Sequence, residues 1–244
     1  MKKIIILFLL VSVVALGQAT QKKINIVCAG NSLTSAVGTN TASLPYPAQL
    51  QRLLGPNFLV TNSGVAGQTT QNISTNYATQ IGNYYNASTY ADNILIVWEV
   101  RNDLVVNNAS STVVTTTQAY NNFVTLCNTA DAQGWKIIVV TVLPSWAAQY
   151  KGNSTSTGYN NIDSDRLTVN ASIVSNWASF SNALVDIGSN SNLGTLGQNA
   201  QAGYVYSSGT RPTKNTWYDD GTHLLNTGYG VIADKVSQAI LKLL

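Results

Sequence analysis

The sequence predicts an α/β fold in which helices cover both faces of a parallel sheet of five strands. Short apolar runs of strand length alternate along the chain with longer amphipathic stretches of helical period. The apolar runs are nearly continuous, which is typical of strands that are buried on both faces of a sheet. Alternation of the two patterns indicates parallel strands joined by crossover helices.

Five segments match each pattern. The expected strands are residues 24–29, 58–62, 93–99, 136–143 and 183–187, and the expected helices are residues 45–54, 69–83, 115–133, 165–179 and 227–243. Two long polar segments, residues 145–164 and 188–222, follow expected strands. Because ligands of such sheets bind outside the carboxyl ends of the strands, we expect both segments to reach the ligand.

The N-terminus has the three parts of a secretory signal. A basic start at residues 1–3 precedes an apolar run at residues 4–16, and small residues flank a cleavage point after Ala19. The alternative, a membrane anchor, is disfavoured because the run is short for a bilayer span. We therefore expect residues 1–19 to be a signal peptide and residues 20–244 to form one secreted or periplasmic domain.

The composition excludes several classes of function. Only 9% of the residues are charged, against about 25% in an average soluble domain. Without Lys2 and Lys3 of the leader, the balance is 11 basic against 10 acidic residues, a net charge of +1. A nucleic-acid partner is not expected, because it would need clustered basic charge. No membrane span is expected in the mature chain, since no apolar run after residue 20 reaches eighteen residues.

The two cysteines, Cys28 and Cys127, are expected to be buried free thiols. Cys28 lies in an apolar strand, and Cys127 shares a helical face with apolar residues. A single disulfide is the alternative in an exported protein. Neither cysteine has the histidine or cysteine neighbours that a zinc site requires.

The single histidine, His223, is a candidate general base. Asp220 precedes it by three residues in a polar turn before the last expected helix. A carboxylate at that spacing can accept the Nδ1 proton and leave Nε2 pointing outward, which is the orienting role of the acid in a catalytic triad. The alternative is that both residues only cap the helix.

Ser32 is the candidate nucleophile. It follows the first expected strand within the segment Gly-Asn-Ser-Leu-Thr at residues 30–34. This position places it at the carboxyl edge of the sheet, where backbone N–H groups are available for nucleophilic catalysis and for oxyanion binding. Taken alone, the segment is a weak signal.

Two further strand ends supply hydrogen-bond donors. Residues 62–68 follow the second expected strand and contain Gly64 and Gly67, which allow the backbone to approach a substrate closely. Residues 98–103 extend past the end of the third expected strand and contain Asn102, whose side-chain amide suits a developing oxyanion. Each segment alone could be a simple turn.

Together these segments resemble the four sequence blocks of the SGNH/GDSL hydrolase superfamily. The blocks are Gly-Asn-Ser-Leu at residues 30–33, Gly-Val-Ala-Gly at 64–67, Val-Arg-Asn-Asp at 100–103 and Asp-Gly-Thr-His at 220–223. They occur in the order of the family and span nearly all of the mature chain. The resemblance implies a three-layer α/β/α sandwich, flavodoxin-like, with five parallel strands.

The resemblance also implies which residues form the site. Ser32, Asp220 and His223 would form the catalytic triad, and Ser32, Gly67 and Asn102 would form the oxyanion hole. The reaction would be acyl transfer to water, without a metal or another cofactor.

Two residues depart from the pattern of the family. Asn31 replaces the usual aspartate, which keeps hydrogen bonding but removes a charge beside the nucleophile. Val100 replaces the usual glycine of the third block. Because a β-branched residue disfavours positive φ, we expect a local difference in the loop that carries Asn102.

The substrate is expected to be an ester of a carbohydrate, small or polymeric, with acetyl or another short acyl group. The two long segments place tyrosine and tryptophan among Asn, Ser and Thr, and Trp217 and Tyr218 lie closest to Asp220. We therefore expect Trp217 and Tyr218 to contact the substrate. The alternative for Trp217 is a packing residue that supports the Asp220 turn. The alternatives are a short-chain esterase, thioesterase or lysophospholipase of the same fold, and a non-catalytic carbohydrate-binding relative.

Overall fold

Five parallel strands form one sheet in the order β2-β1-β3-β4-β5. In the computed structural model, the described residues are 22–36, 44–105, 114–144, 156–194, 217–219 and 222–244. The strands are β1 (Ile24–Gly30), β2 (Phe58–Asn62), β3 (Asp92–Trp98), β4 (Lys136–Val140) and β5 (Ala183–Val185). The predicted parallel α/β fold is confirmed. The predicted signal peptide, residues 1–19, lies outside the described residues.

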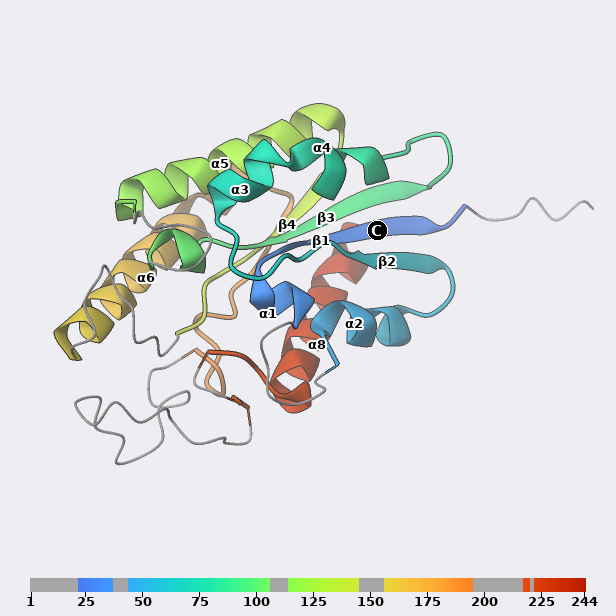
Figure 1. Cartoon of the computed structure of the whole chain (residues 1–244). Coiled ribbons are helices and arrows are strands. Elements are labelled where there is room, and N and C mark those ends of the chain that lie inside the picture. The colour runs from blue at the N-terminus through green and yellow to red at the C-terminus, as the bar shows by residue number, and fades with distance from the viewer. Residues whose placement is uncertain (1–21, 37–43, 106–113, 145–155, 195–216, 220–221) are drawn as a thin grey trace, which may run out of the picture.

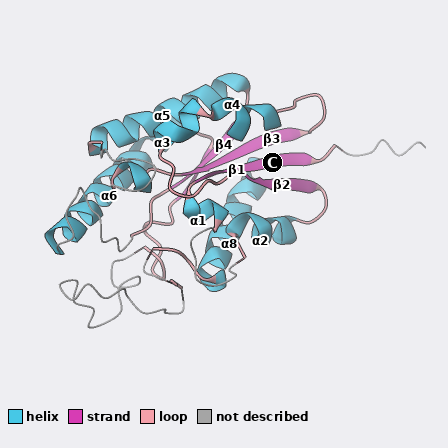
Figure 2. Cartoon of the chain, in the orientation of Figure 1, coloured by secondary structure: helices cyan, strands magenta, loops and turns pink. Residues whose placement is uncertain are grey.

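Helices lie on both sides of this sheet (Figures 1 and 2). They are α1 (Ser32–Ser35), α2 (Tyr46–Leu54), α3 (Thr70–Thr75), α4 (Tyr77–Gln80), α5 (Thr116–Gln133), α6 (Ser156–Asn176) and α8 (Asn226–Leu243). Three single 3₁₀ turns complete the described elements: η1 (Gly82–Tyr84), η2 (Arg101–Asp103) and η3 (Trp177–Ser179). Within the described ranges, no helix is long and apolar enough to cross a membrane.

Three helices differ from the expectation. The helix expected over residues 69–83 is broken into α3, α4 and η1, and at the break the Asn76 side chain bonds to the Asn72 carbonyl. Short polar side chains compete for backbone groups in this way. Helix α6 begins at Ser156 rather than at residue 165. The sequence did not predict this earlier start because the first turns are polar and carry no apolar period. Helix α1, with only four residues, was not expected.

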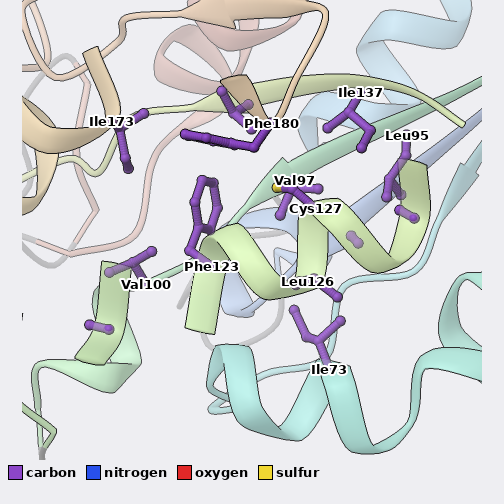
Figure 3. Close-up of a cluster of buried hydrophobic side chains, with 14 of the residues drawn as sticks. Ile73, Leu95, Val97, Val100, Phe123, Leu126, Cys127, Ile137, Ile173 and Phe180 are labelled. Carbon is purple, nitrogen blue, oxygen red and sulfur yellow. The ribbon is translucent and has the colours of Figure 1, made fainter. Parts of the chain in front are cut away.

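One layer of the core lies between the sheet and helices α3, α5 and α6. Phe123, Leu126 and Cys127 of α5 pack with Leu95 and Val97 of β3 (Figure 3). All five side chains are at most 1% exposed. Successive side chains of a strand point to opposite faces of the sheet, so every second strand residue points into this layer.

The second layer of the core lies between the sheet and helices α2 and α8. Leu50 of α2 and Ile232 and Val236 of α8 belong to the same buried cluster as Ile26 and Ile96 of the strands. Burial on both faces explains why β1, β3 and β4 read as continuous apolar runs.

Both cysteines are free and buried, one beneath each layer. Cys28 is in the cluster under α2 and α8, and Cys127 is in the cluster under α5. Burial raises the pKa of the Cys28 thiol to about 12 and raises the pKa of Cys127 as well. Both side chains therefore behave as small apolar residues.

The close approach of β1 and β3 at the carboxyl edge gives a first prediction. Gly30 is paired with Trp98, and a Cβ at residue 30 would collide with the Trp98 carbonyl oxygen and the Thr34 hydroxyl. We expect Gly30→Ala to lower the free energy of unfolding by about 1–3 kcal/mol, measured by urea denaturation. The control is Gly230→Ala in helix α8, where the nearest atom is the Gln49 Oε1 at 3.2 Å. The control is expected to be neutral or to stabilise by about 0.5–1 kcal/mol. Equal stability of Gly30→Ala and the parent would contradict the close approach.

Candidate active site

The turn after β1 presents Ser32. Asn31 is the N-cap of α1: its Oδ1 accepts from the Leu33 N–H at 2.9 Å, and its carbonyl oxygen accepts from the Thr34 and Ser35 N–H groups. These bonds are typical of a capped helix start. They fix the backbone on both sides of Ser32, which is 8% exposed.

His223 lies beside Ser32 although 191 residues separate them along the chain. The distance from His223 Nε2 to Ser32 Oγ is 3.0 Å, within hydrogen-bonding range. Two backbone hydrogen bonds hold the histidine: the Asp219 N–H donates to the His223 carbonyl, and the Leu225 N–H donates to the Trp217 carbonyl, both at 2.8 Å. The structure thus brings together the predicted nucleophile and the predicted base. Asp220, the predicted acid, lies outside the described residues.

The loop after β2 reaches the same edge of the sheet. The Val65 N–H donates to the Gly30 carbonyl at 2.9 Å, which fastens this loop to the end of β1. Gly67 then takes a φ of 79°, a conformation that favours glycine. Gly67 is half-exposed, and within the described residues its N–H has no hydrogen-bond acceptor. Such a group can bind a ligand oxygen.

Asn102 lies in η2, after β3, and its side-chain amide is held at both ends. Its Nδ2 donates to the Gln68 carbonyl at 2.8 Å, and its Oδ1 accepts from Arg101 Nη1 at 2.7 Å. The guanidinium carries only donors, so it fixes which end of the amide is the nitrogen.

Val100 corrects an expectation from the sequence. We expected this β-branched residue to avoid positive φ, yet it takes a φ of 90°. Its side chain is fully buried in the core cluster under α5 (Figure 3). Such a conformation costs about 1–3 kcal/mol, which the burial of an apolar side chain of this size offsets. Val100 therefore adopts a positive φ of the kind that glycine normally supplies, and Asn102 keeps its contact with the loop after β2.

Gln68 is a residue of the site that sequence reasoning did not single out. Its Nε2 donates to the Gly30 carbonyl at 2.7 Å, its Oε1 accepts from Gln80 Nε2 at 3.0 Å, and its own carbonyl accepts from Asn102. It is 4% exposed. Its position directly after the glycine block was visible in the sequence, but nothing there indicated that its side chain turns inward.

Two carboxyl groups are buried behind this edge. Asp103 accepts hydrogen bonds from the Thr70 N–H at 3.0 Å and from the Thr70 hydroxyl, so it joins η2 to the start of α3. Glu99 is 1% exposed and accepts a hydrogen bond from Asn31. Burial raises the pKa of Asp103 to about 6 and the pKa of Glu99 well above its usual range, and the nearby Asp103 adds to the increase at Glu99.

The two aromatic residues predicted to contact substrate have different surroundings. Trp217 is half-buried and packs against the core cluster of α2 and α8. Tyr218 is only 1% exposed, and its hydroxyl donates to the Leu193 carbonyl at 2.7 Å. The expectation of a substrate contact at Tyr218 is therefore replaced by a packing role, because its ring offers no surface for stacking.

A separate open cleft of about 530 Å³ lies between β5 and helix α8. None of the predicted site residues lines it. Among the described residues, no group of three or more His, Cys, Asp or Glu side chains could hold a metal ion.

Solved structures with the same arrangement of strands and helices identify the fold. An acetyl xylan esterase is 12% identical, with a TM-score of 0.60 over 88% of this chain and 99% of that chain. TesA is 16% identical, with a TM-score of 0.59 over 90% and 99%. A GDSL-like lipase from Bacteroides thetaiotaomicron is 18% identical, with a TM-score of 0.57 over 90% and 89%. The chain has the SGNH/GDSL hydrolase fold. No protein-family model and no curated protein matches the sequence.

The buried carboxyl of Asp103 predicts a pH dependence of stability. Its pKa rises from 3.8 to about 6 on folding, so the native chain keeps a proton that the unfolded chain releases in this range. The contribution of this proton to the free energy of unfolding is fully present below about pH 4 and is lost as the pH rises through 6. Asp103→Asn removes the titration, and its Oδ1 can still accept from Thr70.

We expect the free energy of unfolding of the parent to fall relative to that of Asp103→Asn by about 2–3 kcal/mol between pH 4 and 7. Urea denaturation of both proteins at several pH values measures the difference. A difference that does not change with pH would show that Asp103 titrates normally.

Proposed function

We propose that the chain is a secreted serine esterase that hydrolyses short-chain acyl esters, with acetyl esters of carbohydrates as the leading substrates. The observation that carries the proposal is the 3.0 Å contact between His223 Nε2 and Ser32 Oγ at the carboxyl edge of the sheet. Solved structures of the same fold include an acetyl xylan esterase and a GDSL-like lipase, and both names describe enzymes that act on esters. The leader at residues 1–19 supports export.

In the proposed mechanism, Ser32 Oγ attacks the ester carbonyl carbon while its proton passes to His223 Nε2. The carbonyl π-bond electrons move to the oxygen, which becomes an oxyanion. When the tetrahedral intermediate collapses, the C–O bond to the alcohol breaks, and the alkoxide oxygen takes the proton from His223. The products of this half-reaction are the free alcohol and acyl-Ser32.

Three groups are proposed to bind the oxyanion: the N–H groups of Ser32 and Gly67 and the side-chain amide of Asn102. The Ser32 and Gly67 N–H groups have no acceptor within the described residues, and Arg101 orients the Asn102 amide. Donors fixed before the reaction stabilise the developing charge without reorganisation.

Water completes the cycle. His223 removes a proton from a water molecule, which attacks the acyl carbon, and the proton then returns to Ser32 Oγ as the acid leaves. Asp220 is proposed to orient His223 and to stabilise its charged form, as the acid of a triad does. Each step uses only groups of this chain and water.

The carbohydrate part of the proposal rests on the setting of Trp217. Its side chain is half-buried beside the turn that carries His223, which leaves ring surface on which a sugar face can stack. A sparsely charged, exported chain fits an extracellular polymer as substrate. A thioesterase, a lysophospholipase or a general short-chain esterase would use the same catalytic groups, and a carbohydrate-binding relative would use none of them.

The experiment that tests the function is a panel of p-nitrophenyl esters from acetyl to decanoyl, acetylated xylo-oligosaccharides and an acyl thioester. We expect the highest kcat/KM on acetyl esters, with a steep fall beyond butyryl. Ser32→Ala is the control and should lower kcat by roughly 10⁴-fold or more while the fold stays intact. Faster hydrolysis of long-chain esters would contradict the acetyl preference, and no hydrolysis of any ester would contradict the esterase.

Asn102→Ala tests the oxyanion hole. Loss of one donor to the oxyanion should lower kcat by about 10²–10³-fold with little change in KM, because the donor acts mainly in the transition state. Steady-state kinetics on p-nitrophenyl acetate measure both constants. An unchanged kcat would place the oxyanion elsewhere.

Trp217→Ala separates sugar stacking from support of the His223 turn. If the ring stacks on a sugar, kcat/KM should fall by about tenfold on an acetylated xylo-oligosaccharide and much less on p-nitrophenyl acetate. Equal losses on both substrates would mean that Trp217 only supports the turn, as its partial burial also allows.

A further inference from the structure

Glu99 is a buried carboxyl group directly behind the turn that carries Ser32. It is 1% exposed, and its Oε1 accepts a hydrogen bond from Asn31 Nδ2 at 2.8 Å. Its other oxygen, Oε2, has no hydrogen-bond partner in the described part of the chain. The proposed mechanism gives this residue no role. Burial of a carboxyl group costs free energy unless its oxygens are paired.

Hydrogen bonds at both ends hold the Asn31 amide in place. Asn31 Oδ1 accepts from the Leu33 N–H, while Nδ2 donates to Glu99. If the amide were flipped, its nitrogen would face the Leu33 N–H and its oxygen would face a carboxyl oxygen. The contact with Leu33 would then join two donors, and the contact with Glu99 would need the proton of the carboxyl group on the facing oxygen. Glu99 therefore keeps the cap of α1 in place.

We propose that Glu99 is a positioning residue for the nucleophile: its carboxyl fixes the Asn31 amide, and the capped turn then presents the Ser32 hydroxyl to His223. The inference rests on the proposed function, because it assigns a role in presenting a reactive serine. It also explains why residue 31 is asparagine where the resembling family usually has aspartate. An aspartate there would place a second carboxyl group against Glu99.

The charges around Glu99 favour its neutral form. Burial and the nearby Asp103 raise the pKa of Glu99, while Arg101 and the hydrogen bond from Asn31 lower it by less. A protonated Glu99 beside a neutral Asn31 leaves the nucleophile turn without net charge. The Asn31 amide does not titrate, so Glu99 is the one titratable partner of the pair.

Five proteins test the inference: the parent, Glu99→Leu, Glu99→Gln, Asn31→Asp and the double variant Asn31→Asp/Glu99→Gln. The readout is the second-order rate at which a fluorophosphonate labels Ser32, measured between about pH 5 and 9. This probe reports the reactivity of the serine and needs no knowledge of the substrate. Peptide mass spectrometry confirms the labelled residue.

Glu99→Leu leaves a buried amide donor unpaired, and labelling should slow by about ten- to hundredfold. Glu99→Gln keeps an acceptor for Asn31, so its rate should stay within about threefold of the parent, since the hydrogen bond is retained. Asn31→Asp places two carboxyl groups together that hold one proton between them. Its labelling should therefore fall as the pH rises and the second group ionises.

The double variant supplies the decisive comparison. The glutamine introduced at position 99 would donate from its side-chain nitrogen to the carboxylate introduced at position 31. The hydrogen bond is then restored with its direction reversed, and only one acid remains. We expect its labelling at high pH to recover to within about threefold of the parent, because the pair again has one donor and one acceptor. A merely structural role would not produce this pH-dependent loss and rescue.

Ile240→Ala in helix α8 is the control for lost stability, since it removes a fully buried side chain from the core cluster under α2 and α8. Its labelling rate should equal that of the parent. If Ser32 of the parent is labelled and the Glu99→Leu variant is labelled equally fast, the inference is overturned while the proposed function stands. An Asn31→Asp variant with the same pH profile as the parent would also overturn the inference only. A parent that is not labelled at Ser32 would contradict the proposed function and, with it, the inference.

Discussion

The hydrogen bonds of Gln68 hold together the three loops that form the candidate site. Its side chain binds the Gly30 carbonyl at the end of β1, and its carbonyl binds Asn102 after β3. Gln68 itself belongs to the loop after β2. Parallel strands bring these loops to one edge of the sheet, but only to within several ångströms. The bonds of Gln68 set the final positions of Gly67 and Asn102 relative to the Ser32 turn.

The segment from Glu99 to Asp103 joins the rest of the site to this arrangement. Its polar side chains face different neighbours: Glu99 accepts from Asn31, Arg101 donates to Asn102, and Asp103 accepts from Thr70. The positive φ of Val100 makes the turn possible, and the burial of its side chain offsets the strain.

The sequence predicted most of the fold because buried parallel strands have a strong pattern. All five strands lie where apolar runs predicted them, and the pattern is strongest in buried strands such as β3 at Asp92–Trp98. The start of α6 at Ser156 was missed because a polar segment carries no period. The proximity of Ser32 to His223 was expected from the blocks and the sheet topology. The inward turn of Gln68, the burial of Tyr218 and the pairing of Glu99 with Asn31 depend on tertiary contacts, so no local pattern could indicate them.

The central claim is that Ser32, Gly67 and Asn102 surround the oxygen of a tetrahedral intermediate. The most direct measurement is a crystal structure of the protein after reaction with a methyl fluorophosphonate, whose adduct mimics that intermediate. The account predicts a covalent bond from Ser32 Oγ to phosphorus, with the phosphonyl oxygen about 2.7–3.1 Å from the Ser32 and Gly67 nitrogens and Asn102 Nδ2. An adduct on another residue, or a phosphonyl oxygen that points away from Gly67 and Asn102, would contradict it.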